Sequence, residues 1–156
     1  NGYCQDNPDF WFNGQDINKN RELFRFTKEL IKQRFALELV CFDSNTRHSL
    51  HDIIAHAGIS WHGTELYNPN WNADSHAIAV ESQHPHCKKS VIYVIFNAYW
   101  EALNFELPVS PTGKWQRIVD TSLTKGEDIY IEGNKKQWVK NRKYLAAPRS
   151  VVILVG

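Results

Sequence analysis

The chain contains no methionine and only three cysteines, and its charges almost cancel, with 18 basic against 17 acidic residues among 156. Such a balance argues against a nucleic-acid or anionic-membrane partner, because both attract clustered positive charge. The longest apolar run, Val151 to Val155, is far shorter than the ~20 residues of a membrane-spanning helix. No basic stretch followed by an apolar segment opens the chain, so no signal peptide is expected. These absences predict a soluble domain.

The cysteines Cys4, Cys41 and Cys87 are odd in number and form no C-x-x-C pair. This pattern favours reduced thiols, and we expect a cytoplasmic location. The absence of methionine, together with Asn1 as first residue, predicts that these residues belong to a longer chain.

One amphipathic helix is predicted near the start of the chain, from Asp16 to Arg34. Ile17, Phe24 and Ile31 recur every seven residues and form an apolar stripe, as in a helix that packs on something larger. Asp16 is a suitable N-cap. One helix cannot bury its own stripe, so the stripe must cover the rest of the domain or contact another chain.

After Phe35 the pattern is mostly that of β-strands. The predicted strands are Leu37–Cys41, Val91–Phe96, Leu103–Leu107, Trp115–Asp120 and Ser150–Val155. Val91–Phe96 is apolar on both faces and is expected to be central. Short strands separated by turn residues favour an antiparallel sandwich or barrel. Residues 44–58 fit a short helix and a long loop equally well.

The segment His84-Pro85-His86-Cys87 offers three metal-binding side chains. A structural zinc site would need a second ligand cluster, and none is visible, so we expect an exposed turn without a metal or cofactor. A domain regulated by a metal ion or by redox chemistry is therefore the least favoured functional hypothesis.

Two features suggest contact with a polyhydroxylated ligand. The opening residues Asn1 to Asn7 are rich in hydrogen-bonding groups and run into Phe10-Trp11-Phe12, although a plain loop is the simpler interpretation. Trp61 and Trp71 flank a turn and could stack on sugar rings. Because tryptophan is usually buried, we expect both rings to close one end of the core instead.

The opening segment resembles the signature of isoamylase-type glycogen and starch debranching enzymes, in the α-amylase clan. The residues that carry this resemblance are Asn1-Gly2-Tyr3-Cys4-Gln5-Asp6-Asn7. In that family the signature lies in the loop after the eighth strand of the catalytic (β/α)₈ barrel. Further segments resemble, in order, the C-terminal β-sandwich of the same enzymes: Ile59–Gly63, Asn70-Trp71, Phe96–Ala98, Leu107-Pro108 and Val119–Thr121. Two features depart from the family: Arg34 to Leu37 lacks a His-Pro step, and residues 48–56 resemble an insertion.

The resemblance implies a mainly β fold. Residues 1–35 would be a loop and one α-helix from the end of the barrel, and residues 36–156 an antiparallel Greek-key β-sandwich, the C-terminal domain of the α-amylase clan. The longer parent would be a retaining hydrolase of α-1,6 branch linkages, with a covalent intermediate and closely spaced carboxyl groups. The catalytic carboxylates of the family lie upstream, so no residue here is expected to be catalytic.

The implied partners are an α-glucan such as glycogen or amylopectin, the rest of the barrel, and a second copy bound through the helix stripe. We expect the sandwich to stabilise the barrel, and the alternative is a glucan-binding module that uses exposed tryptophans. The candidate substrate-binding residues are Tyr3, Gln5, Asp6, Asn7, Trp61, Trp71 and Trp100.

Overall fold

The structure, a computed structural model, describes residues 6, 11, 14–36, 58–84 and 87–156, without the side chains of 84–90. Helices α1 (Gln15–Lys19) and α2 (Arg21–Ala36) come first. The described strands are β1 (Gly58–His62), β2 (Ala77–His84), β3 (Cys87–Asn97), β4 (Leu103–Glu106), β5 (Trp115–Asp120), β6 (Gln137–Val139), β7 (Lys143–Ala146) and β8 (Ser150–Val155).

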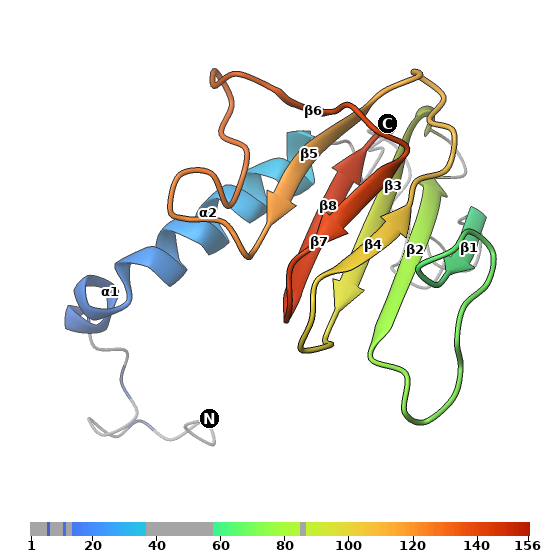
Figure 1. Cartoon of the computed structure of the whole chain (residues 1–156). Coiled ribbons are helices and arrows are strands. Elements are labelled where there is room, and N and C mark those ends of the chain that lie inside the picture. The colour runs from blue at the N-terminus through green and yellow to red at the C-terminus, as the bar shows by residue number, and fades with distance from the viewer. Residues whose placement is uncertain (1–5, 7–10, 12–13, 37–57, 85–86) are drawn as a thin grey trace.

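The larger of the two sheets has six strands in the order β1-β2-β3-β8-β5-β6, and every pairing is antiparallel. Strand β8 lies between β3 and β5, although it follows both in the sequence (Figure 1). The predicted strands at Val91–Phe96, Trp115–Asp120 and Ser150–Val155 are confirmed. The apolar run of β3 occupies an interior position, as expected of a strand with apolar residues on both faces.

The second sheet is the antiparallel pair β4–β7, which covers one face of the larger sheet. Fully buried side chains from both sheets form the core between them: Ala79, Tyr93, Ile95, Phe105, Ala146, Val152 and Leu154. The chain crosses between the sheets after β3, β4, β6 and β7. The predicted antiparallel β-sandwich with Greek-key crossings is therefore confirmed.

Three hydrogen bonds pair polar side chains inside the sandwich. The Tyr93 hydroxyl donates to the Glu106 carbonyl at 3.1 Å, and the Trp115 indole N–H donates to the Pro108 carbonyl at 2.8 Å. The Tyr144 hydroxyl donates to the Asp120 carboxylate at 2.6 Å. Burial and this carboxylate raise the pKa of Tyr144 to about 12. These bonds fix the register of the two sheets, because an unpaired buried polar group is costly.

The helical segment differs from the single helix expected between Asp16 and Arg34. It is broken at Asn20, whose backbone angles (φ −112°, ψ 34°) leave the helical region. The Asn20 side chain donates to the Asp16 carbonyl at 3.1 Å and so competes with the regular backbone ladder. The first helix begins after Gly14, so Asp16 lies inside it and is not the N-cap.

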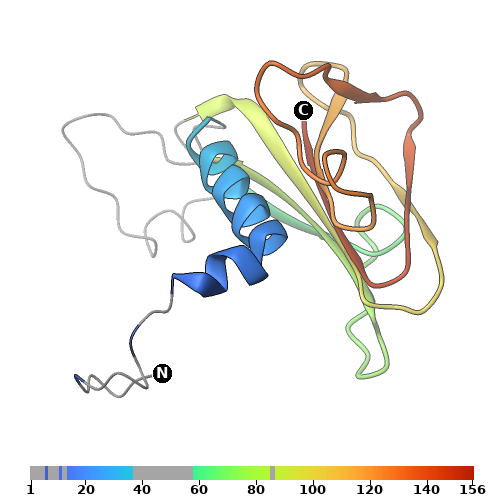
Figure 2. The ribbon, with the colours of Figure 1, turned by 90° about the vertical axis from the view of Figure 1, so that its left-hand side faces the viewer.

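Helix α2 lies against the face of the six-stranded sheet that is turned away from the β4–β7 pair (Figures 1 and 2). Neither described helix is long and apolar enough to cross a membrane. The predicted strand Leu37–Cys41 and most of the undecided segment 44–58 lie outside the described residues; of that segment only Gly58, which starts β1, is described.

Candidate functional site

The contact between α2 and the sandwich is largely polar. The Arg25 guanidinium donates to the Asp128 carboxylate at 2.5 Å, and the Gln33 amide donates to the Tyr130 carbonyl at 2.8 Å. Phe26 packs against a small apolar cluster that includes Ile129. Burial alone would raise the pKa of Asp128, but the Arg25 guanidinium and the backbone N–H groups of Gly126 and Ile129 together outweigh it and lower that pKa. The helix is therefore held by directional bonds and one aromatic contact.

The apolar stripe of α2 faces away from the sandwich. The helix buries Glu29 and Gln33, whereas Phe24 is 53% exposed, Ile31 51% and Phe35 63%. Ile17, Leu23 and Phe24 line a shallow groove at the junction of the two helices. An amphipathic helix normally buries its apolar side, so this arrangement is inverted relative to the described part of the molecule.

The loop between β1 and β2 is built around the buried His62. Its ring lies 4.8 Å from the ring of Tyr67 and 5.4 Å from that of Tyr93, and its Nδ1 accepts the backbone N–H of Tyr67 at 2.9 Å. Burial lowers the pKa of His62, although the nearby Glu81 opposes this. The imidazole is thus neutral at pH 7, and the 3.6 Å approach of Nε2 to Glu81 is not an ion pair.

Two backbone positions fix the shape of this loop. Tyr67 adopts a positive φ of 57°, which is uncommon for a residue with a side chain. At Gly63 a Cβ would lie 2.3 Å from the Asn68 carbonyl oxygen, so only glycine fits. The loop therefore has one well-defined path over the end of the sheet.

A pocket of about 780 Å³ opens between this loop and the turn that follows β3. Its lining residues include Glu65, Asn70, Trp71, Asp74, His76 and Tyr99. The backbone N–H of Ala98 donates to the His76 carbonyl at 2.8 Å and ties the two walls together. The lining thus combines aromatic rings with amide and carboxylate groups, a composition suited to a polar organic ligand.

Aromatic rings are paired on both sides of this pocket. Trp61 and Trp71 meet edge to face with centroids 5.6 Å apart, and Tyr99 and Trp100 lie 3.9 Å apart. The ring of His76 is 6.4 Å from that of Trp100. The structure therefore brings the three tryptophans predicted from the sequence to one end of the sandwich.

Exposure of these rings contradicts the expectation that Trp61 and Trp71 close the core. Trp61 is 45% exposed, Trp71 66% and Trp100 60%, and Trp115 alone of the six tryptophans is buried. Trp61 is on the outer face of β1, beside Val80 of β2, whereas its neighbour His62 points into the sandwich. The alternation of β1 therefore places Trp61 outside, because successive side chains point to opposite faces.

Of the opening segment, only Asp6 and Trp11 are among the described residues. Asp6 accepts a hydrogen bond from the Trp11 indole at 2.8 Å, and both residues precede α1, which lies far from β1 (Figure 1). Tyr3, Gln5 and Asn7 lie outside the described residues.

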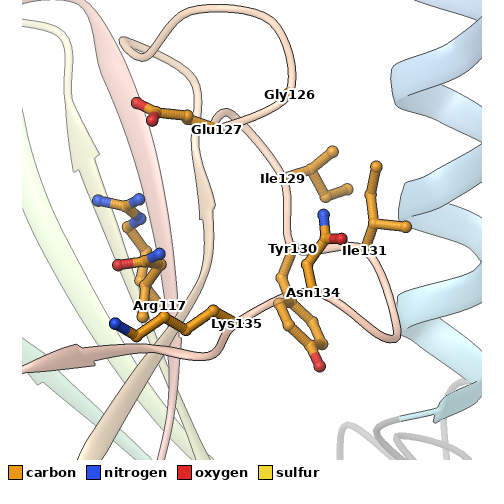
Figure 3. Close-up of a pocket in the computed structure, with 9 residues that line it drawn as sticks. Arg117, Gly126, Glu127, Ile129, Tyr130, Ile131, Asn134 and Lys135 are labelled. Carbon is orange, nitrogen blue, oxygen red and sulfur yellow. The ribbon is translucent and has the colours of Figure 1, made fainter.

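A second pocket, of about 190 Å³, lies between the sheet and the segment that follows β5 (Figure 3). Arg117 and Lys135 lie on its sheet side, and Ile131 points toward α2. Because this same segment provides Asp128 and the Tyr130 carbonyl to α2, we assign the pocket to the attachment of the helix.

No group of three or more histidine, cysteine, aspartate or glutamate side chains able to hold a metal ion occurs within the described residues. The side chains of the turn His84-Pro85-His86-Cys87 lie outside that part of the chain.

The sequence analysis does not identify three residues of the pocket: His76, Asp74 and Tyr99. The available signal was the adjacency of Tyr99 to Trp100, which doubles the aromatic surface at one turn.

Comparison with known proteins places these strands in a family. The family described as "Isoamylase 1-3, C-terminal" matches residues 60–152, from β1 into β8. The chain is 33% identical to isoamylase 1 of Arabidopsis thaliana over 78% of its length, covering 14% of that protein. It is 30% identical to isoamylase 1 of rice over 85% of its length (15% of the relative), and 27% identical to rice isoamylase 3 over 99% (18%). The chain thus spans less than a fifth of these relatives.

The comparisons correct the expected location and confirm the expected family. Each is a protein named as chloroplastic, so the cytoplasmic location expected from the cysteines is wrong; reduced thiols are equally compatible with other intracellular compartments. The resemblance drawn from the sequence motifs is confirmed by a match that covers more than half of the chain. The chain belongs to the isoamylase C-terminal domain family.

Proposed function

We propose that this chain is the C-terminal part of a glucan-debranching isoamylase, in which it supports the catalytic domain and carries no catalytic residue. The observation that carries the proposal is the inverted orientation of α2. Its polar side is bound to the sandwich through Arg25 and Gln33, and its apolar side is exposed.

An exposed apolar helix face indicates a missing neighbour. Burying a side chain such as Leu23, Phe24 or Ile31 contributes about 1.5–3 kcal/mol each, so a partner on this face would be held firmly. The proposed neighbour is the catalytic (β/α)₈ barrel, of which α2 would be the last helix. Residues 1–35 would then belong to the barrel and 36–156 to the sandwich.

The activity of the parent follows from its family. We propose that it cleaves α-1,6 branch linkages of glycogen or amylopectin with retention, using carboxylates of the preceding barrel. Tyr3, Gln5, Asp6 and Asn7 would lie near the substrate, because loops at that end of a barrel build the active site. A plastid is the proposed location, since the named relatives are chloroplastic.

A chimera tests the supporting role. This chain would replace the corresponding C-terminal segment of the Arabidopsis isoamylase 1, its relative at 33% identity, and branch cleavage of amylopectin would be measured. We expect an active chimera, and loss of soluble, active enzyme when Phe24 and Ile31 are both replaced by aspartate. Trp138→Ala, at an exposed position on β6, is the matched control and should retain activity.

The isolated chain offers a second readout of the same surface. Without a barrel, α2 should pair with a second copy, and light scattering should report a dimer that the double aspartate variant converts to a monomer. A soluble chimera that unfolds cooperatively but leaves branches intact would contradict the proposed function.

A further inference from the structure

We propose that the pocket between the β1–β2 loop and the turn after β3 binds a segment of α-glucan chain. The proposal rests on the function proposed above, which supplies the substrate class. It assigns a site to residues that the supporting role leaves unused: Trp71, Asp74, His76, Tyr99 and Trp100.

The aromatic rings provide the apolar part of such a site. Trp71 lines the pocket from the loop, and Tyr99 lines it from the opposite wall, with the tilted ring of Trp100 centred 3.9 Å from its own. Both tryptophans remain more than half exposed. The C–H face of a glucose ring packs well on an aromatic ring, and the rings of Trp71 and Tyr99, on two walls of the pocket, suit a curved α-linked chain.

The charges of the pocket select a neutral ligand. Glu65 and Asp74 are carboxylates, Asn70 and Asn72 are amides, and no lysine or arginine is among the lining residues. A phosphorylated ligand would be repelled by this set, whereas sugar hydroxyls can donate to the carboxylates and amide oxygens. Asp74 has no hydrogen-bond partner among the residues that the structure describes, so its carboxylate is available.

Hydrogen bonds within the protein hold both walls of the pocket in place without a ligand. The Asn97 side-chain oxygen accepts the backbone N–H of Tyr99 at 3.1 Å, and the two N–H groups of the Asn97 amide are shared among three carbonyl oxygens, including that of Glu101 at 3.0 Å. On the other wall, the Ser75 N–H donates to the Asn72 carbonyl at 2.9 Å. Such preorganisation lowers the entropy lost on binding.

Native gel electrophoresis of the 156-residue chain, with and without amylopectin in the gel, tests the site. We expect amylopectin to retard the chain, and Trp71→Ala and Trp100→Ala each to weaken the affinity at least about fivefold, as is usual for truncated tryptophan anchors. Trp138→Ala, similarly exposed but on β6 at the opposite edge of the sheet, should be retarded like the native chain. Thermal unfolding of each variant checks that the sandwich is intact.

Maltoheptaose and cellohexaose, titrated separately while tryptophan fluorescence is followed, define the ligand class. A response to maltoheptaose alone supports an α-glucan site. Unchanged mobility of the folded chain in amylopectin, or retardation that survives the combined Trp71→Ala and Trp100→Ala changes, overturns it. If the chimera is active but amylopectin does not retard the isolated chain, the pocket is rejected as a glucan site and the supporting role stands. If amylopectin retards the chain but the chimera is folded and inactive, the supporting role is rejected and the glucan site stands.

Discussion

The two faces of the six-stranded sheet are covered in opposite ways. The face toward β4–β7 is sealed by fully buried apolar side chains such as Tyr93, Phe105 and Leu154. The face toward α2 is joined through the Arg25–Asp128 pair, Gln33 and the single aromatic contact of Phe26. The first interface can hold a fold together unaided, because apolar burial is the main stabilising term. The second mainly orients a helix whose apolar side faces elsewhere.

Breaking the apolar interface should have the largest effect. Phe105→Ala removes a fully buried ring and leaves a cavity, so the free energy of unfolding should fall by about 3–5 kcal/mol. Urea denaturation of the 156-residue chain measures this value. Phe24→Ala is the matched variant on the exposed side of α2, and at a protein concentration low enough to keep the chain monomeric its cost should stay below about 0.5 kcal/mol. Equal costs at the two positions in the monomer would show that the helix face is covered by the same chain.

Breaking the polar interface should release the helix while the sandwich survives. Arg25→Met leaves the Asp128 carboxylate without its cation, and we expect the opening free energy of α2 to fall by about 1–3 kcal/mol. Hydrogen exchange should then accelerate at amides of α2 and remain slow in β3 and β8. Lys125→Gln removes only an exposed pair with Glu22 and should leave exchange unchanged. Faster exchange throughout the sheet would mean that the two interfaces unfold together.

Acid should weaken this polar interface at a low pH. Because the folded state lowers the pKa of Asp128, its contribution is present above the unfolded pKa of 3.8 and is lost as the pH falls through the folded value. Exchange at α2 in the native chain should therefore rise below about pH 4. In Arg25→Met that rise should be absent.

The smallest effect is expected from His62. Its folded pKa lies below the ordinary histidine value of 6.5, so the unfolded chain takes up a proton at a higher pH than the folded chain does. Stability should then decline as the pH falls from about 6.5 toward the folded pKa, and should be constant above that window. Melting temperatures between pH 7 and 5 test this, with His62→Gln as the variant in which the slope should be shallower. An identical slope in both chains would assign the decline to other groups.

Strand periodicity made the sandwich predictable. The runs at β3, β5 and β8 were recognisable because apolar residues fill consecutive or alternating positions there. The break at Asn20 was hidden, since a single helical periodicity continues from Ile17 to Ile31 across it. The motifs resembling debranching enzymes added the family, which periodicity alone cannot supply.

The direction in which α2 faces could not be predicted. The sequence shows an apolar stripe but not which side of the helix contacts the sandwich. Arg25 pairs with Asp128, which lies 103 residues away in the sequence, and no local pattern links the two residues. The pocket was only partly foreseeable for the same reason. The sequence identifies Trp71 and Trp100 as candidates, whereas their position at the same end of the sandwich depends on the pairing of β2 with β3.

The position of β8 also constrains how the protein is made. Every other described strand leaves the ribosome before β8, yet β8 supplies the partner for both β3 and β5. Until it emerges, the nascent chain holds two separate strand groups, each with an unpaired apolar edge that invites association with other chains. A stop codon before Ser150 would therefore leave a chain that aggregates during synthesis. In the native chain, a chaperone would be needed most just before β8 emerges, when the edges of β3 and β5 are still unpaired.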